Sequence, residues 1–191
     1  MEIDGEAIYL IKNACEAAKE IKWVDKNVDT LAYSLRAESF ARAIEQAKTL
    51  VYRATNKFMP TYMVISPEVM PILAFVPGFN ASNNAIANGA YFAGTVNNLK
   101  VFVSPALTPE SDDAVGVCYL GVLGADGVTA TGIYAPYMPI VPTQLLGFAD
   151  GSMEQGFSTL YDMKILNKNL ISKITIVKGE DSADVAVTKT V

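Results

Sequence analysis

The chain has 191 residues, of which 51% are hydrophobic and 18% are charged. That length suffices for one ordinary domain, or one domain with a small annex, and the composition excludes a disordered chain. Fifteen Lys and Arg against twenty Asp and Glu give a net charge of −5, which leaves non-specific attraction to phosphate backbones without an electrostatic source, and we expect no specific nucleic-acid binding.

The cysteines and the long uncharged stretches exclude two further classes of protein. Cys15 and Cys118 lie far apart and match no paired-cysteine metal spacing, so we predict neither a disulfide framework nor a zinc site. Residues 69–99 and 127–149 carry no charge, but they contain two and three prolines respectively, which would break a membrane-spanning helix. We therefore expect no membrane partner.

Charge is distributed unevenly along the chain. Residues 1–60 hold nine acids and nine bases, and residues 161–191 hold four acids and five bases. Residues 61–160 hold seven acids and a single base, Lys100. Such a shift indicates a change of structural role in the nearly uncharged middle segment.

The first segment predicts two amphipathic helices. The first helix has apolar residues at helical spacing after a candidate cap at Asp4, namely Ile8, Ile11, Cys15 and Ala18. The second helix is expected from near Asp29 toward Asn56, with one apolar stripe formed by Phe40, Ile44, Ala47 and Val51. Two charge-balanced helices of this kind usually pack one face against the core and expose the opposite face to solvent.

The middle segment predicts short strands and turns. Tyr62–Ile65 is typical of a strand, and Ser66-Pro67-Glu68 then predicts the start of a short helix that ends near Ala74. Two β-hairpins are expected after it. The first joins 91–96 to 99–104 through Asn97-Asn98, and the second joins 115–123 to 128–134 through a turn with Asp126-Gly127.

The last segment predicts strands with one solvated face. Tyr161, Met163 and Ile165 alternate with polar residues, and Ile174 and Ile176 do the same farther on. Residues 179–191 are expected to form a loose tail.

Catalytic chemistry finds little support in the sequence. Histidine is absent, and no phosphate-binding loop, dinucleotide fingerprint, nucleophile elbow or zinc-protease motif is present. Cys118 lies in an apolar run and reads as a small buried hydrophobe. Six carboxylates fall in predicted turns: Glu110, Asp112, Asp113, Asp126, Asp150 and Glu154. Carboxylates in such turns are usually solvated, and an acid/base pair or a metal site is the less favoured alternative. We predict no catalytic residue, no metal site and no cofactor.

Residues 132–142 combine aromatic and apolar side chains with three prolines. A strand so interrupted cannot be central in a sheet. Two readings stay open on these residues alone: an edge loop packed over the core, or a surface made for contact.

Three segments together resemble the major capsid proteins of tailed bacteriophages, especially the myovirus type. They are Tyr91-Phe92-Ala93-Gly94-Thr95 leading into Lys100-Val101-Phe102-Val103, Met63-Val64-Ile65-Ser66-Pro67, and Gly132-Ile133-Tyr134-Ala135-Pro136-Tyr137. The resemblance runs from the second helix to 147–148, about two thirds of the chain. It implies an α+β fold of the Hong Kong 97 type, with a mixed sheet flanked by helices in an axial domain and part of a peripheral domain with its spine helix.

The resemblance also implies a domain division and a function. Residues 1–60 would be the helical part of the peripheral domain, 61–150 the axial domain, 151–178 closing strands of the axial/peripheral sheet, and 179–191 a tail. The chain would be a subunit of an icosahedral phage or prophage capsid that forms hexamers and pentamers around packaged DNA. Its partners would be copies of itself, with scaffold, portal or decoration proteins as further candidates, and it would reside in the virion after assembly in the bacterial cytoplasm.

The functional residues implied are contact residues. Low charge in the middle segment fits burial between subunits, since rotationally symmetric rings need apolar heterologous contacts. We expect an axial-domain contact at or beside five residues: Tyr134, Pro136, Tyr137, Met138 and Pro139.

One departure from the family pattern leaves alternatives open. The N-terminal arm and the long extended loop that precede the spine helix in these proteins are not visible in the sequence, as expected of a truncated chain, a prophage remnant or a processed form. An encapsulin-like shell subunit and a capsid-derived accessory protein are therefore the alternatives within this fold. An enzyme or small-ligand binder that uses the acidic loops is the alternative outside it.

Overall fold

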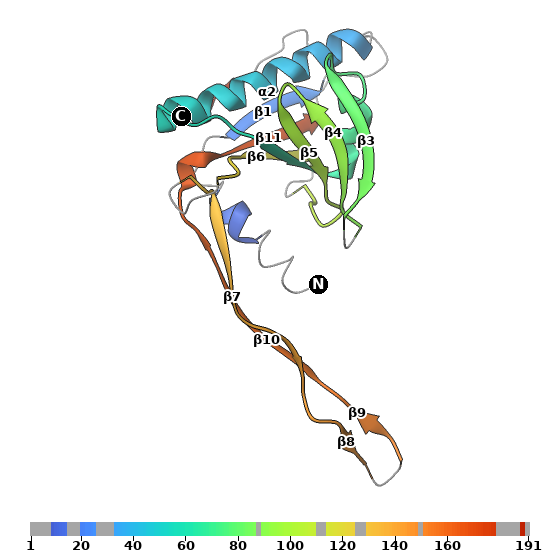
Figure 1. The fold of residues 1–191 in the computed structure, drawn as a ribbon. Helices are drawn as coiled ribbons and strands as arrows, with labels where there is room; N and C mark the ends of the chain where they lie inside the picture. The colour runs from blue at the N-terminus through green and yellow to red at the C-terminus, as the bar shows by residue number, and fades with distance from the viewer. Residues whose placement is uncertain are drawn as a thin grey trace.

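A single mixed sheet organises the chain (Figure 1). The computed structural model describes residues 9–14, 20–25, 33–86, 89–109, 114–124, 129–148, 151–178 and 188–189. The eight strands lie side by side in the order β12 (Thr188–Lys189), β1 (Glu20–Asp25), β11 (Ile171–Lys178), β6 (Ala114–Gly121), β2 (Tyr62–Ile65), β5 (Leu99–Val103), β4 (Tyr91–Val96) and β3 (Phe79–Ala85). β1 pairs parallel with β11 and β2 pairs parallel with β5, whereas the other neighbours are antiparallel.

The long helix α2 (Tyr33–Thr55) covers one face of this sheet (Figure 1). Its predicted stripe faces the core, because Phe40, Ile44, Ala47 and Val51 are all 0% exposed. The ring of Phe40 meets that of Trp23 on β1 edge-on, with centroids 5.2 Å apart. Asn56 ends the helix in the left-handed region at φ 52°. The prediction of this helix is confirmed.

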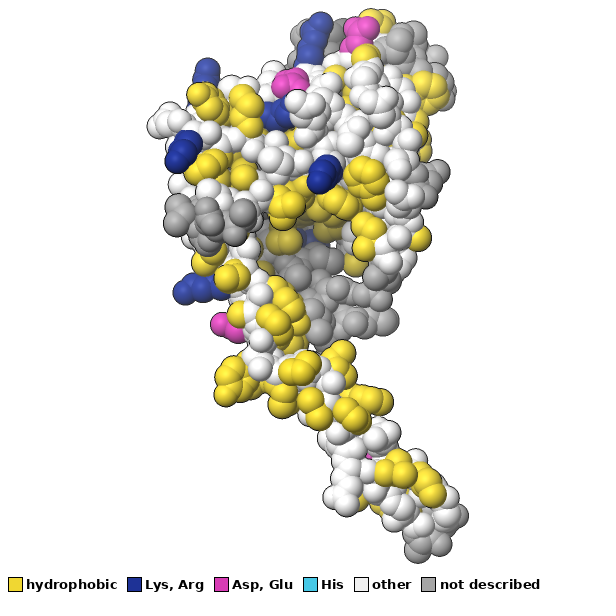
Figure 2. Space-filling view, viewed as in Figure 1, with side chains coloured by type: hydrophobic (Ala, Val, Ile, Leu, Met, Phe, Trp, Pro, Cys, Tyr) yellow, Lys and Arg dark blue, Asp and Glu magenta, His cyan; other side chains and the backbone are white. Residues whose placement is uncertain are grey.

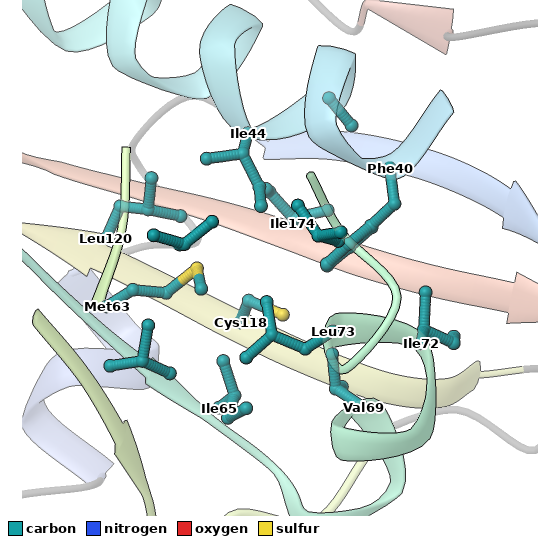
Figure 3. Close-up of a cluster of buried hydrophobic side chains, with 14 of the residues drawn as sticks. Phe40, Ile44, Met63, Ile65, Val69, Ile72, Leu73, Cys118, Leu120 and Ile174 are labelled. Atoms are coloured by element: carbon teal, nitrogen blue, oxygen red, sulfur yellow. The ribbon is translucent and has the colours of Figure 1, made fainter. Parts of the chain in front are cut away.

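The core lies mainly between α2 and the sheet (Figure 3). Cys118 and Leu120 of β6 point into this layer, whereas Val117 and Tyr119 point to the opposite face and form a smaller cluster with Ile171. Alternating residues of one strand thus serve both faces, so β6 is buried on both sides.

The packing shows no break at residue 60. β1 and α2 share one buried cluster with β2, β4, β5, β6 and β11. The assignment of 1–60 to a peripheral domain and of 61–150 to an axial domain stays a prediction. In the predicted first helix, residues 9–14 are helical, and its other residues lie outside the described ones. Within the predicted tail, 188–189 form β12 against β1.

The predicted strand over 62–65 is confirmed as β2, and the predicted short helix is confirmed as η1 (Pro67–Val69) followed by α3 (Met70–Leu73). Ser66 occupies the N-cap position of η1, as its place before Pro67 predicts, but its side chain makes no capping hydrogen bond. Its hydroxyl instead accepts a hydrogen bond from the Val117 N–H at 3.2 Å. Ser66 therefore joins the start of the helix to the neighbouring strand β6.

The first predicted hairpin is confirmed as β4 and β5. Asn97 and Asn98 both have positive φ, 46° and 67°, which suits the two-residue turn whose twist matches that of the strands. The Lys48 ammonium on α2 donates to the Asn97 carbonyl oxygen at 2.9 Å. The turn is thereby tied to the helix.

The second predicted hairpin is wrong. β6 pairs with β2 and β11, and residues 132–142 form β7, which pairs instead with β10 (Phe157–Ile165). β6 is buried almost throughout and lies in the middle of the sheet. β7 cannot take such a central position, because its prolines lack the N–H groups that a central strand needs. The turn residues Asp126 and Gly127 lie outside the described residues.

β7 and β10 leave the sheet together and project away from the body as a two-stranded ribbon (Figure 1). β8 (Leu146–Gly147) and β9 (Met153–Glu154) pair near its tip. At its base, η2 (Lys168–Leu170) leads into β11, and Asn167 caps η2 by accepting a hydrogen bond from the Asn169 N–H.

We predict that Gly94→Ala destabilises the body while Gly147→Ala does not. Gly94 has φ 144°, and a Cβ there would overlap the Asn80 carbonyl oxygen of β3, whereas a Cβ on Gly147 meets nothing within 4 Å. Thermal unfolding of both variants measures the effect. We expect Gly94→Ala to lose about 2 kcal/mol or more of stability, as backbone overlap and strain require. Equal melting temperatures for the two variants would contradict this account of β4.

Candidate assembly interface

The ribbon is an antiparallel ladder that runs from Gly132↔Ile165 at the body to Pro142↔Phe157. Two register shifts on β10, between Ser158 and Leu160 and between Leu160 and Tyr161, interrupt it. At this irregularity the Thr159 hydroxyl donates to the Met138 carbonyl oxygen at 2.9 Å. The regular part of β10 is therefore Tyr161–Ile165, next to the body.

All five residues predicted at a contact lie on β7. Tyr134, Pro136, Tyr137 and Pro139 are exposed and Met138 is half-buried, and Tyr137 reaches 84% exposure. The Tyr134 ring packs against that of Tyr161 on β10, with centroids 5.8 Å apart. The structure thus gathers these residues on one projecting strand, and their part in a contact between subunits stays a prediction.

Other exposed apolar residues of the ribbon were not among the five predicted contact residues. Six of them lie on β7, on β10 or near the tip: Ile140, Leu145, Leu146, Met153, Phe157 and Leu160. Met153 is 74% exposed and Phe157 is 70% exposed. The signal that could have found them is the near absence of charge between residues 127 and 161, which extends beyond the proline-containing stretch at 132–142.

Hydrophobic side chains gather along the ribbon, as Figure 2 shows. In residues 129–148 and 151–161, Glu154 is the one charged side chain. Burial of this surface against another protein would therefore desolvate few ions, whose removal from water is costly. An apolar surface that lies outside the core of its own chain is typical of a site of protein contact.

Thr131 anchors the ribbon to the body. Its buried hydroxyl donates to the Val122 carbonyl oxygen at 2.9 Å and accepts from the Val122 N–H at 3.2 Å. Its own carbonyl oxygen accepts hydrogen bonds from the N–H groups of Leu166 and Asn167. One residue thus joins the end of β6, the start of β7 and the end of β10.

Thr143 pins the two strands farther out. Its N–H donates to the Gly156 carbonyl oxygen at 2.7 Å, and its hydroxyl accepts from the Gly156 N–H at 2.9 Å. The Gln155 amide donates to the Thr143 carbonyl oxygen. The distal part of the ribbon is therefore held in register by backbone and threonine hydrogen bonds.

Residues suited to catalysis do not converge in the part of the chain that the structure describes. Burial raises the pKa of the Cys118 thiol, so the nucleophilic thiolate is disfavoured. Of the six carboxylates, Glu154 is exposed on β9, and the other five lie outside the described residues. An open groove of about 220 Å³ at the ribbon base is mostly apolar, with Lys164 as its charged residue.

The described residues hold no cluster of three potential metal ligands and no helix long and apolar enough to cross a membrane.

Comparisons with solved structures identify the fold. The chain is similar to a subunit in the asymmetric unit of the bacteriophage PhiM1 mature capsid, with a TM-score of 0.58, 17% identity, and coverage of 91% of this chain and 60% of that one. It is also similar to the capsid structure of cyanophage P-SCSP1u, with a TM-score of 0.56, 13% identity, and coverage of 93% of this chain and 62% of that one. A phage-related protein from Bordetella bronchiseptica gives a TM-score of 0.52, 12% identity, and coverage of 88% of this chain and 59% of that one. The fold is that of Hong Kong 97-type capsid proteins, as the sequence predicted.

The family model for the major capsid protein Gp23 matches residues 1–189. The chain therefore belongs to the major capsid protein Gp23 family, a family of structural proteins and not of enzymes. No curated protein sequence matches it. The chain spans about 60% of the length of the three capsid-like chains described above.

We predict that Thr131→Val loosens the ribbon base. Valine keeps the size of the side chain but leaves the Val122 N–H without its hydroxyl partner, at a cost of about 1–3 kcal/mol. Chemical denaturation measures the loss of stability. Thr159→Val, which removes an exposed hydroxyl from the ribbon, is the matched control and should cost less than about 1 kcal/mol. Equal losses would argue against Thr131 as the anchor.

We also predict that Cys118 resists thiol reagents in the native protein. Its side chain is 0% exposed and its raised pKa keeps the thiol protonated, so in a Cys15→Ser variant it should react only after unfolding. Mass spectrometry after iodoacetamide treatment at pH 8, with and without denaturant, measures this. Complete modification within minutes under native conditions would show that the packing around β6 is wrong.

Proposed function

We propose that the chain is a shell-forming subunit of an icosahedral phage or prophage capsid, which assembles into hexamers and pentamers that enclose packaged DNA. The observation that carries the proposal is the largely apolar ribbon, nearly free of charge beyond residue 162 toward its tip, which projects from a well-packed body in a member of a major capsid protein family. Copies of the chain itself are its principal partners, and the virion capsid is its place of action.

The exposed apolar surface of the ribbon favours contact with another subunit. A two-stranded ribbon buries little of its own side-chain area and is marginally stable alone. Exposed Tyr137, Ile140 and Phe157 would gain free energy by leaving water, at about 25 cal/mol for each Å² of apolar surface buried. A neighbouring subunit in a ring supplies such cover repeatedly, because a heterologous contact is made once per subunit around the symmetry axis.

The net charge of −5 also suits a container for DNA, since an acidic protein gains no counterion-release energy from binding phosphates. Scaffold, portal or decoration proteins are further partners in this proposal, and no described residue selects among them. We place the five predicted contact residues of β7 at the interface between neighbouring subunits.

We predict that Tyr137→Glu abolishes assembly without unfolding the chain. Tyr137 is 84% exposed, so the substitution alters the ribbon surface and leaves the core intact. Wild-type protein should form rings or larger assemblies at high concentration in sedimentation velocity and negative-stain electron microscopy. Tyr137→Glu should sediment as a monomer with an unchanged melting temperature, because burial of a carboxylate costs several kcal/mol.

Tyr52→Glu is the matched control, because Tyr52 is exposed on the body helix α2 and not on the ribbon strands, and should leave assembly intact. Wild-type protein that stays monomeric at high concentration and neutral pH would contradict the proposed function. Assembly of the Tyr137→Glu variant would contradict the place given to β7.

A further inference from the structure

We propose that the regular part of β10, Tyr161–Ile165, is a self-complementary edge that pairs antiparallel with the same segment of a second copy, about a two-fold axis at Met163. The proposal rests on the proposed function and deepens it, because it names the element and the register of one contact between subunits.

The two edges of the ribbon differ in their capacity to accept a strand. β7 carries Pro136, Pro139 and Pro142, and a proline offers no N–H to a new neighbour. β10 carries no proline, and in the described part of the chain its only strand partner is β7. The edge of β10 away from β7 therefore lacks the proline interruptions of β7, and an edge of this kind is a template for another strand.

The irregularity at Thr159 limits the length of that template. Between Tyr161 and Ile165 the ladder with β7 continues without a shift, whereas two shifts lie between Ser158 and Tyr161. Five residues of regular edge remain. They lie next to the body, where Thr131 holds the end of the strand.

Charge complementarity selects the partner and the register. Asp162 and Lys164 are exposed on one face of β10, and Tyr161, Met163 and Ile165 lie half-buried on the other. In an antiparallel pair centred on Met163, Asp162 of each copy faces Lys164 of the other, and Tyr161 faces Ile165. Opposite charges directly across a strand pair stabilise it, and like charges destabilise it.

Neighbouring registers lack this match. A pair centred on Asp162 sets two aspartates opposite each other, and a pair centred on Lys164 sets two lysines opposite each other. A pair centred on Tyr161 leaves Asp162 opposite Leu160. A parallel in-register pair places each charge beside its own copy. A second copy in the Met163-centred register is therefore the occupant that this edge fits best.

This contact is isologous, so by itself it joins two copies and does not close a ring.

Charge reversal with complementation tests the proposal. Asp162→Lys and Lys164→Asp each present like charges to a second copy of themselves, so sedimentation equilibrium should show self-association weakened about tenfold in each. An equimolar mixture of the two variants restores both opposite-charge pairs, and so does the double variant Asp162→Lys, Lys164→Asp. Both should associate as tightly as the wild type. Lys100→Asp, which makes the same charge change on β5 of the body, should have no effect.

A cross-link reads out the register. In a Cys15→Ser background, Met163→Cys should form a disulfide-linked dimer on mild oxidation, because residue 163 faces itself across the axis, and Ile140→Cys on β7 should not. Equal cross-linking of both variants, or a mixture of reversed variants that stays as weak as its components, would overturn the pairing. A wild-type chain that stays monomeric would overturn it as well.

The outcomes separate this inference from the proposed function. Rings that form equally well in wild-type protein and in both single reversals would uphold the shell function and overturn the β10 pairing. Dimers that depend on the charge pair and cross-link at residue 163, without any larger assembly, would uphold the pairing and overturn the shell function.

Discussion

The burial of apolar surface divides this molecule into two parts with opposite needs. In the body, α2 and the mixed sheet fully enclose Phe40, Ile44 and Cys118. In the ribbon, two strands share one ladder and leave Tyr137 and Phe157 in water. Water disfavours such surface, and no described element of the chain forms a layer over it, so the role of the ribbon depends on what that surface contacts.

The body provides a rigid mount for the ribbon. β6 passes through the middle of the sheet, and its end is joined by Thr131 to the first residues of β7 and to the end of β10. A projecting element held by buried hydrogen bonds at its base can present side chains at a fixed position relative to the core. Membership of the major capsid protein Gp23 family gives this arrangement its context, since shell subunits must meet their neighbours in repeated geometry.

Local signals in the sequence predicted much of the body. The stripe on α2, the strand at Tyr62, the helix after Pro67 and the Asn97-Asn98 turn follow from periodicity, capping and turn chemistry, and all are present. These local signals could not predict which strands pair with each other. β6 and β7 are neighbours in sequence with a turn signal between them, yet burial on both faces draws β6 into the sheet and prolines exclude β7 from it. The five contact residues share one strand, but the apolar surface of β10 and the tip became visible only with the pairing of the strands.

Hydrogen–deuterium exchange across a concentration series distinguishes a ribbon covered by other subunits from one covered by its own chain, because it reports on the ribbon and the body separately. We expect amides of 132–142 and 157–165 to exchange rapidly in dilute protein and to become protected as concentration rises, while amides of β2, β6 and β11 are protected throughout. Ribbon amides that are equally protected at all concentrations would show that the chain covers this surface by itself, and would contradict the account.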